Sequence, residues 1–268
     1  MILEYRLRSM KATATLIALL LVGSVSASAQ KIKKAQFKLE KKADGTVIID
    51  NFENDTVGQL PKEWYNRNGE RRPITYPPKE RNTYKYVVKK ENGNQYLHFA
   101  SSAAKHLNYP LINKDVDIYQ TPVLTWKWRV FKVPEGANED DNSTNDTAAS
   151  IYVVFDMGHV LFKKVPKSIR YTWSSTLEKG THLSKLFGNQ HIVVMESGTD
   201  DTGKWITFQR NIVEDYRRFF GDDPPAKPLA ILILSDGDST GKESIADYDD
   251  IKLLPASLAR GTASEKND

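Results

Sequence analysis

A short acidic segment, residues 235–241, carries the oxygen ligands that a hard cation prefers. Asp236, Asp238 and Thr240 alternate along it, and Gly241 follows where a sharp turn is needed. Alternating oxygen donors on a tight loop can converge on one Ca²⁺ ion. The segment therefore predicts a structural calcium site with Asp236, Asp238 and Thr240 as ligands. The alternative is an ordinary solvated turn, because the same residue types are good turn formers.

Acidic residues near the two ends of the expected domain predict a second calcium site. Glu53 follows the first apolar run, and Asp250 immediately precedes the last one. The first and last strands of a closed β-sandwich are often neighbours, so carboxylates from both ends can share a cation. We therefore expect calcium between Glu53 and Asp250, with solvated charges at strand ends as the alternative.

Aromatic and arginine side chains form a separate set of candidates, for ligand binding. Trp64 and Tyr65 lie in a loop-like segment, where a flat ring can stack on a sugar. Arg129, Arg170 and Arg210 lie in or beside expected strands, and a cluster on one face would hold a carboxylate or sulfate bidentately. The alternatives are burial of the aromatic rings and ion pairs between the arginines and neighbouring acids.

Catalytic motifs are missing from the chain. It has no cysteine, which excludes disulfides, a thiol nucleophile and thiolate zinc sites. It also lacks the G-x-S-x-G, H-E-x-x-H and phosphate-loop motifs. Carboxylate pairs such as Glu178 and Glu196 could serve a glycosidase. The sequence therefore leaves open whether the chain is an enzyme.

Short strands are the elements that must position these residues. From residue 46 onward, apolar and polar residues alternate in short runs separated by turn residues. Asn92 and Gly93 join two runs, and this dipeptide is typical of a β-hairpin. In the long run 122–133, Trp126 and Trp128 share one face with other apolar residues, which places them in a core. The pattern predicts a mainly β fold, a jelly-roll-like sandwich of two sheets.

One segment has helical periodicity instead. Residues 211–221 begin with Asn211, which can cap the first turn, and end with Gly221, which suits the C-terminal cap. Tyr216 and Phe219 lie on one apolar face with other large residues. The sequence therefore predicts one α-helix packed on the sandwich.

The N-terminus has the features of a cleaved signal peptide. Basic residues precede a short apolar stretch, and Ala27, Ser28 and Ala29 form a small-residue cleavage site. The apolar stretch is too short to span a bilayer. We therefore expect export to the periplasm or the extracellular medium, with no transmembrane span after cleavage.

Four segments are expected along the chain. They are the signal peptide (1–29), a basic flexible arm (30–45), the β-sandwich domain (46–255) and a disordered tail (256–268). The formal charge of the chain is +4, which does not favour nucleic acid as a partner.

Four sequence blocks resemble an exported bacterial family, the domain of unknown function 3047. They are DTAASIYVVF (146–155), RYTWSS (170–175), EDYRRFFG (214–221) and SDGDSTG (235–241). The resemblance extends from about residue 47 to residue 254 and implies no activity, substrate or catalytic residue. The combination of Phe52-Glu53, Trp64 and Asp249-Asp250 also resembles jelly-roll carbohydrate-binding modules more loosely.

These observations favour a non-catalytic binding module that takes a glycan or another cell-envelope polymer and holds structural calcium. The first alternative is a secreted polysaccharide hydrolase or lyase. The second is an envelope domain that acts through protein contacts. A carboxylate pair in a deep cleft would favour the enzyme, whereas a shallow groove with aromatic side chains would favour the binding module.

Overall fold

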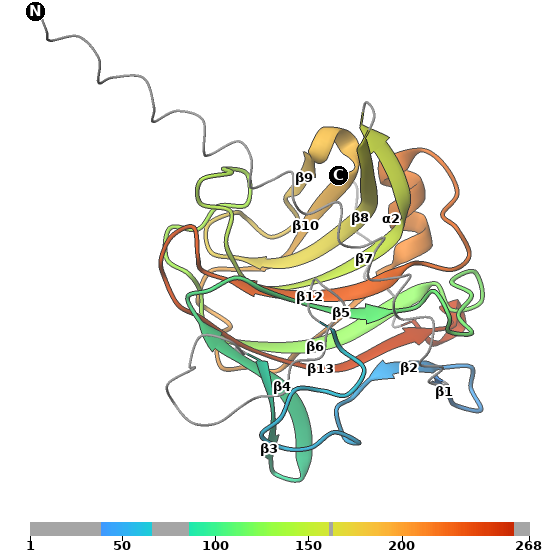
Figure 1. Cartoon of the computed structure of the whole chain (residues 1–268), viewed down its shortest axis with the longest axis horizontal. Helices are drawn as coiled ribbons and strands as arrows, with labels where there is room; N and C mark the ends of the chain where they lie inside the picture. The colour runs from blue at the N-terminus through green and yellow to red at the C-terminus, as the bar shows by residue number, and fades with distance from the viewer. Residues whose placement is uncertain (1–38, 66–85, 161–162, 260–268) are drawn as a thin grey trace, which may run out of the picture.

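Two β-sheets face each other across a hydrophobic interior in the computed structural model, which describes residues 39–65, 86–160 and 163–259 (Figure 1). Figure 1 shows the two layers, with one helix beside the second sheet. The mainly β, two-sheet sandwich with a packed helix is the fold that the sequence predicts.

The first sheet, sheet A, is built from strands that are far apart in the sequence. Its described strands are β1 (Glu40–Lys41), β2 (Val47–Asp50), β3 (Tyr86–Glu91), β4 (Asn94–Ser101), β6 (Val123–Lys132), β11 (Ile206–Asn211) and β13 (Ser244–Leu254). The strand order is β1-β2-β13-β4-β3, and β6 pairs with both β13 and β11. The first and last strands of the domain, β2 and β13, are thus neighbours, as predicted.

The second sheet, sheet B, has the strand order β5-β12-β7-β8-β10-β9. Its described strands are β5 (Lys105–Pro110), β7 (Thr147–Val160), β8 (Lys163–Ser174), β9 (His182–Lys185), β10 (Gln190–Ser197) and β12 (Ala230–Asp236). Its described strands pair antiparallel except β8 and β10, which are parallel. The described helices are α2 (Ile212–Phe220) and two 3₁₀ turns, η3 (Leu186–Gly188) and η4 (Ala256–Leu258).

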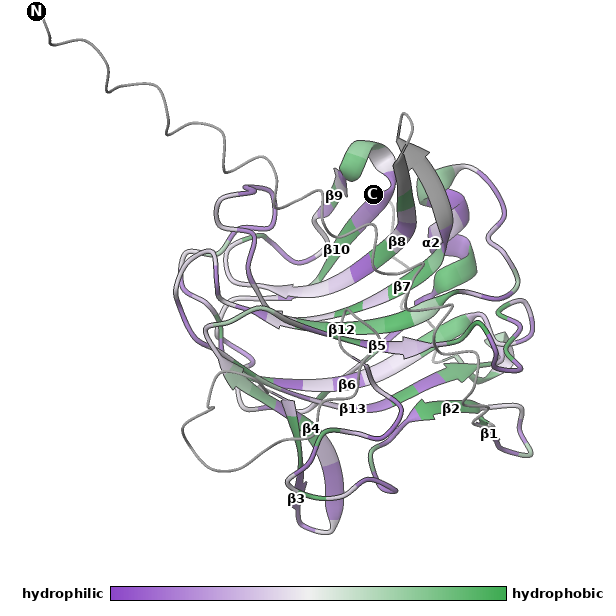
Figure 2. Cartoon of the chain, viewed as in Figure 1, coloured by the Kyte–Doolittle hydropathy of each residue, from purple (hydrophilic) through white to green (hydrophobic). Residues whose placement is uncertain are grey.

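The core lies between the sheets and is rich in aromatic rings. Trp126 and Trp128 from β6 are fully buried, as the alternation of that strand predicts. The Trp126 ring stacks on Tyr171, with centroids 5.4 Å apart, and Trp128 packs on Trp173 at 6.4 Å. Figure 2 shows hydrophobic and hydrophilic residues mixed along single strands, which is the two-residue alternation of a sheet with one buried face.

Helix α2 closes one end of the sandwich. The Asn211 side chain accepts hydrogen bonds from the backbone of Val213 and Glu214, and Gly221 adopts the left-handed conformation after the last turn. Both caps agree with the sequence-based prediction. Tyr216 is buried and packs on Phe155 at a centroid distance of 4.7 Å, so the helix docks through its predicted apolar face.

The C-terminal part of α2 rests on a histidine pair. His182 Nε2 and His191 Nδ1 lie 2.9 Å apart, and the Phe219 ring stacks on both imidazoles at 4.3 and 5.0 Å. Burial lowers the pKa of both histidines, and the charge of Arg218 lowers that of His182 further. The pair is therefore held in the uncharged form beneath the helix.

We expect this histidine pair to cost stability in acid. Below pH 6.5, the usual pKa of histidine, these two histidines bind more protons in the unfolded chain than in the folded protein. The stabilising contribution of the histidine pair is complete above that pH and is lost as the pH falls. Chemical denaturation should show that the free energy of unfolding falls more between pH 7.5 and pH 5.5 in the wild type than in His191→Gln. Equal losses would contradict this. The comparison with the variant is needed because Asp50, Asp236 and Asp249, whose pKa values burial raises to about 7, 8 and 6, act in the opposite direction.

One described element lies beyond each end of the domain expected from the sequence, 46–255. β1 lies inside the segment expected to be a flexible arm, and it pairs with β2. The 3₁₀ turn η4 lies inside the segment expected to be a disordered tail. The predicted signal peptide, residues 30–38 of the expected arm and residues 260–268 of the expected tail lie outside the described residues. None of the described helices has the length and apolar character required to cross a bilayer.

Candidate functional site

A groove of about 430 Å³ crosses the outer face of sheet A. Its walls come from the β3–β4 hairpin, from β13 and β6, and from the residue that precedes β11. The lining residues are Glu91, Asn92, Asn94, Tyr96, Lys127, Arg129, Trp205 and Asp249. Because Trp126 and Trp128 point into the core, the alternate residues Lys127 and Arg129 point outward into this groove. The groove therefore combines two aromatic rings with amide groups and charges of both signs.

Arg129 is held rigidly at the centre of the groove. Its Nε and Nη2 donate to Asp247 Oδ2 at 3.0 and 2.8 Å, and its Nη1 donates to Glu91 Oε2 at 2.8 Å. The guanidinium lies over the rings of Trp205 and Phe131, 4.7 and 4.8 Å from their centroids. Ion pairs and ring contacts together fix the position of this cation.

Asp249 lies beside Arg129 with a different set of partners. Its Oδ2 accepts from Asn94 Nδ2 at 3.0 Å, and its Oδ1 accepts from the Asp250 backbone at 2.7 Å. Burial raises the pKa of Asp249 to about 6, against the opposing effect of the Asn94 hydrogen bond. The neighbouring Lys127 forms an ion pair with Asp250 at 2.7 Å.

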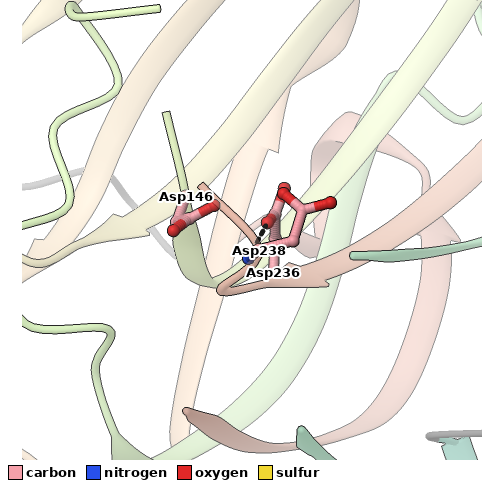
Figure 3. Close-up of side chains that lie close together, drawn as sticks. All are labelled: Asp146, Asp236 and Asp238. Carbon is pink, nitrogen blue, oxygen red and sulfur yellow. Dashed lines mark hydrogen bonds between the residues drawn. The ribbon is translucent and has the colours of Figure 1, made fainter. Parts of the chain in front are cut away.

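A second cluster lies at the end of sheet B, where β12 and β7 meet. Asp146, Asp236 and Asp238 each offer a carboxylate oxygen, and these oxygens lie within 4.8 Å of one another (Figure 3). Asp146 is fully buried, Asp236 is 8% exposed and Asp238 is exposed. The donors are all hard oxygens, so this acidic triad could bind an ion.

The surroundings of the acidic triad explain its electrostatics. Asp146 accepts hydrogen bonds from the Ser239 and Thr240 backbones at 3.1 and 2.7 Å and from the Thr240 hydroxyl at 2.6 Å. Burial, together with a shared hydrogen bond to Asp146 and the charge of that residue, raises the pKa of Asp236 to about 8. The loop thus holds two buried carboxyl groups together, and one of them retains a proton at neutral pH.

Two of the three predicted calcium ligands of residues 235–241 are in this triad. Asp236 and Asp238 come together as predicted, whereas the Thr240 hydroxyl donates to Asp146 and positions it. The other predicted pair does not form such a cluster. Asp250 forms ion pairs with Lys127 and Lys252 at 2.7 and 2.6 Å, and Glu53 Oε1 accepts from the Gln95 backbone at 2.8 Å. The charge of Asp250 is therefore already compensated.

Trp64 is a core residue and not an exposed stacking surface. It is fully buried, its Nε1 donates to Asp50 Oδ2 at 2.7 Å, and its ring packs on Tyr109 at 5.3 Å. The segment looks loop-like in the sequence but folds over the edge of the sandwich. Tyr65 is half-buried and forms a backbone bridge with Asn108.

The three arginines predicted to share a face lie on three different surfaces. Arg129 points out of sheet A into the groove. Arg170 lies on the outer face of sheet B, almost fully buried, and its Nε donates to Ser150 Oγ at 2.9 Å. Arg210 faces α2, where its Nε donates to Asp215 Oδ2 at 2.8 Å. The expected common anion site is absent because neighbouring strands and alternate residues send the three side chains apart.

Most residues of the groove and one residue of the acidic triad were missed at the sequence level. Trp205 and Tyr96 line the groove, and Asp146 completes the acidic triad. The sequence signal for the groove is the polar face of β6, opposite Trp126 and Trp128. Asp146 had no such signal, because it is about ninety residues from Asp236 and only the pairing of β7 with β12 brings them together.

Residues 62–252 match the family described as "Protein of unknown function (DUF3047)". The chain belongs to this family. The DUF3047 region contains the whole groove and the whole acidic triad, whereas β1 and β2 precede it. Three of the four blocks by which the sequence resembles the family supply Arg170 and the three aspartates of the triad. None of the curated proteins matches this DUF3047 chain.

Several solved structures are similar to the DUF3047 chain in fold alone. The family 11 carbohydrate-binding module of cellulase Lic26A-Cel5E of Clostridium thermocellum is 11% identical, with 80% of this chain and 97% of that chain covered and a TM-score of 0.39. The family 30 module of cellulase Cel9D-Cel44B of the same organism is 11% identical, with 79% and 98% covered and a TM-score of 0.39. The family 29 module of Piromyces equi is 6% identical, with 79% and 91% covered and a TM-score of 0.30. Likeness at this level carries no argument about ligands.

Proposed function

We propose that this chain is an exported, non-catalytic domain that binds a glycan in the groove on sheet A. The observation that carries the proposal is the half-buried indole of Trp205, which lines the groove with the Tyr96 ring among polar and charged side chains. Sugar rings have apolar faces that suit aromatic stacking and hydroxyl edges that need hydrogen-bond partners. A wall that offers both kinds of contact suits this class of ligand.

The shape of the groove also suits a chain of sugars. It runs across the strands, from Asn92 in the hairpin turn to Trp205 on the far side of β6. The amide groups of Asn92 and Asn94 can donate and accept hydrogen bonds with hydroxyl groups. Arg129 and its partners form a rigid floor, so little conformational entropy is lost when a ligand binds.

We expect Trp205→Ala to weaken glycan binding by at least about tenfold, because removal of a central aromatic contact typically costs more than 1 kcal/mol. A glycan array would identify ligands of the wild-type protein, and calorimetry would then compare the variants. Phe187→Ala is the matched control, because Phe187 is 91% exposed in the turn between β9 and β10, on sheet B. Equal losses in the two variants would contradict a binding role for the groove.

The same experiments test the polysaccharide hydrolase alternative. Release of new reducing ends from a bound glycan would show that the chain is an enzyme. Binding without release supports the non-catalytic proposal.

Structural calcium is the second part of the proposal, and we assign it to Asp146, Asp236 and Asp238. Three carboxylates with oxygens inside 4.8 Å repel one another unless a proton or a cation compensates them. Ca²⁺ takes oxygen ligands and would replace the proton that Asp236 holds. The ion would tie the end of β12 to the start of β7.

A further inference from the structure

Carboxylates outnumber lysine and arginine side chains around the sheet A groove, and this excess affects which glycans the groove can bind. The inference rests on the proposed function, since it concerns the ligand of the same groove. Four carboxylates lie in or directly behind the groove, accompanied by two lysines and one arginine, and the imidazole of His98 also pairs with Asp247 at 2.6 Å. The carboxylates are Glu91, Asp247, Asp249 and Asp250, and the cations are Lys127, Arg129 and Lys252.

Each of these cations already has a carboxylate partner. Arg129 donates through three nitrogens, twice to Asp247 and once to Glu91. Lys127 and Lys252 share Asp250, at 2.7 and 2.6 Å. An anionic ligand would therefore have to compete for these cations with carboxylates that belong to the protein.

Asp249 supplies the surplus negative charge. Its hydrogen-bond donors are the Asn94 amide and the Asp250 backbone, both neutral. Among the described residues, no lysine, arginine or histidine lies within ion-pair distance of it. Glu91 adds a carboxylate at the rim whose side chain is 49% exposed. An anion brought into this groove would therefore meet like charge, which the more distant Lys127 offsets only in part.

We infer that the groove selects uncharged glycan chains and rejects chains that carry carboxylates. Sugar hydroxyl groups can donate hydrogen bonds to the carboxylate and amide oxygens of the wall without adding charge. Rejection of uronate-containing chains follows because both cations that line the groove, Lys127 and Arg129, already pair with carboxylates of the protein.

Two matched polymer pairs test this selectivity. Hydroxyethyl cellulose is compared with carboxymethyl cellulose, and galactomannan with galactomannan oxidised to carboxylates at C6. The neutral member of a bound pair should have a dissociation constant at least about tenfold lower at low salt. Added sodium chloride should reduce the difference between the two dissociation constants, because salt screens the repulsion at an open groove. Equal or tighter binding of the carboxylated member would overturn the inference while leaving glycan binding intact. Failure of every glycan to bind would instead contradict the proposed function.

A charge variant links the selectivity to the groove. Glu91→Gln removes a partner of Arg129 and one negative charge at the rim. The ratio of the dissociation constants of the carboxylated and the neutral ligand should therefore fall by about threefold or more. Glu178→Gln is the matched control, because Glu178 is exposed in the loop that follows β8. An unchanged ratio in Glu91→Gln, or an equal change in both variants, would overturn the electrostatic explanation.

Discussion

Replacement of Asp215 by alanine is expected to lower the free energy of unfolding by about 3 kcal/mol, because it breaks a buried charged network. Asp215 is 4% exposed on the inner side of α2. Its Oδ2 accepts from Tyr171 Oη at 2.6 Å and from Arg210 Nε at 2.8 Å, and its Oδ1 accepts from Arg210 Nη2. Without the carboxylate, a largely buried guanidinium and a fully buried phenol lose their partner.

Chemical denaturation of the variant and of Glu214→Ala checks this expectation. Glu214 is the preceding helix residue and is exposed, so its loss should cost less than about 1 kcal/mol through the helix dipole. A double variant, Asp215→Leu with Arg210→Met, should be more stable than Asp215→Ala, since it leaves no unpaired buried charge. Similar small losses in Asp215→Ala and Glu214→Ala would show that the network does not hold the helix in place.

Calcium is expected to raise the melting temperature of protein that has been treated with a chelator. A cation that binds only the folded state stabilises it by about 2.7 kcal/mol at a hundredfold excess over the dissociation constant. The rise should disappear in Asp146→Asn and in Asp236→Asn. Because burial raises the pKa of Asp236 to about 8, calcium must displace a proton at neutral pH. The apparent affinity should therefore increase between pH 6.5 and 8.5.

Asp250→Asn distinguishes between the two calcium sites that the sequence predicts. Asp250 has two lysine partners, so this variant should retain the calcium-dependent rise. Loss of the rise in Asp250→Asn alone would place the ion at the other end of the domain. An unchanged melting curve in the wild type, together with no heat of binding, would remove calcium from the proposed function.

The secondary structure could be predicted because its signals are local. The alternation of Trp126 and Trp128 with Lys127 and Arg129 identifies both the core face and the outer face of β6. The caps of α2 are residue types with a known backbone preference. Strands β1, β5 and β9 were not predicted, because their short runs consist mainly of polar and charged residues with few apolar ones.

The candidate sites depend on pairing between strands that are distant in the sequence, which explains what was missed. Asp146 meets Asp236 only through the register of β7 and β12. Arg129 meets Asp247 through the register of β6 and β13. Trp64 was predicted to be an exposed ligand-binding residue because its neighbours in the sequence are polar, but it is buried and donates to Asp50. Local patterns therefore indicate which face a residue occupies, but not which residue it meets there.

The position of β13 has a consequence for how the chain folds. This last strand lies between β2 and β4 on one side and β6 on the other, and Ile251 pairs with Asp50, about two hundred residues earlier. While the polypeptide is being synthesised, these three strands lack that neighbour until residues 244–254 have left the ribosome. Folding of sheet A is thus a late, slow step dominated by distant contacts. A chain that terminates prematurely before Ser244 leaves open strand edges, and such edges are prone to aggregate.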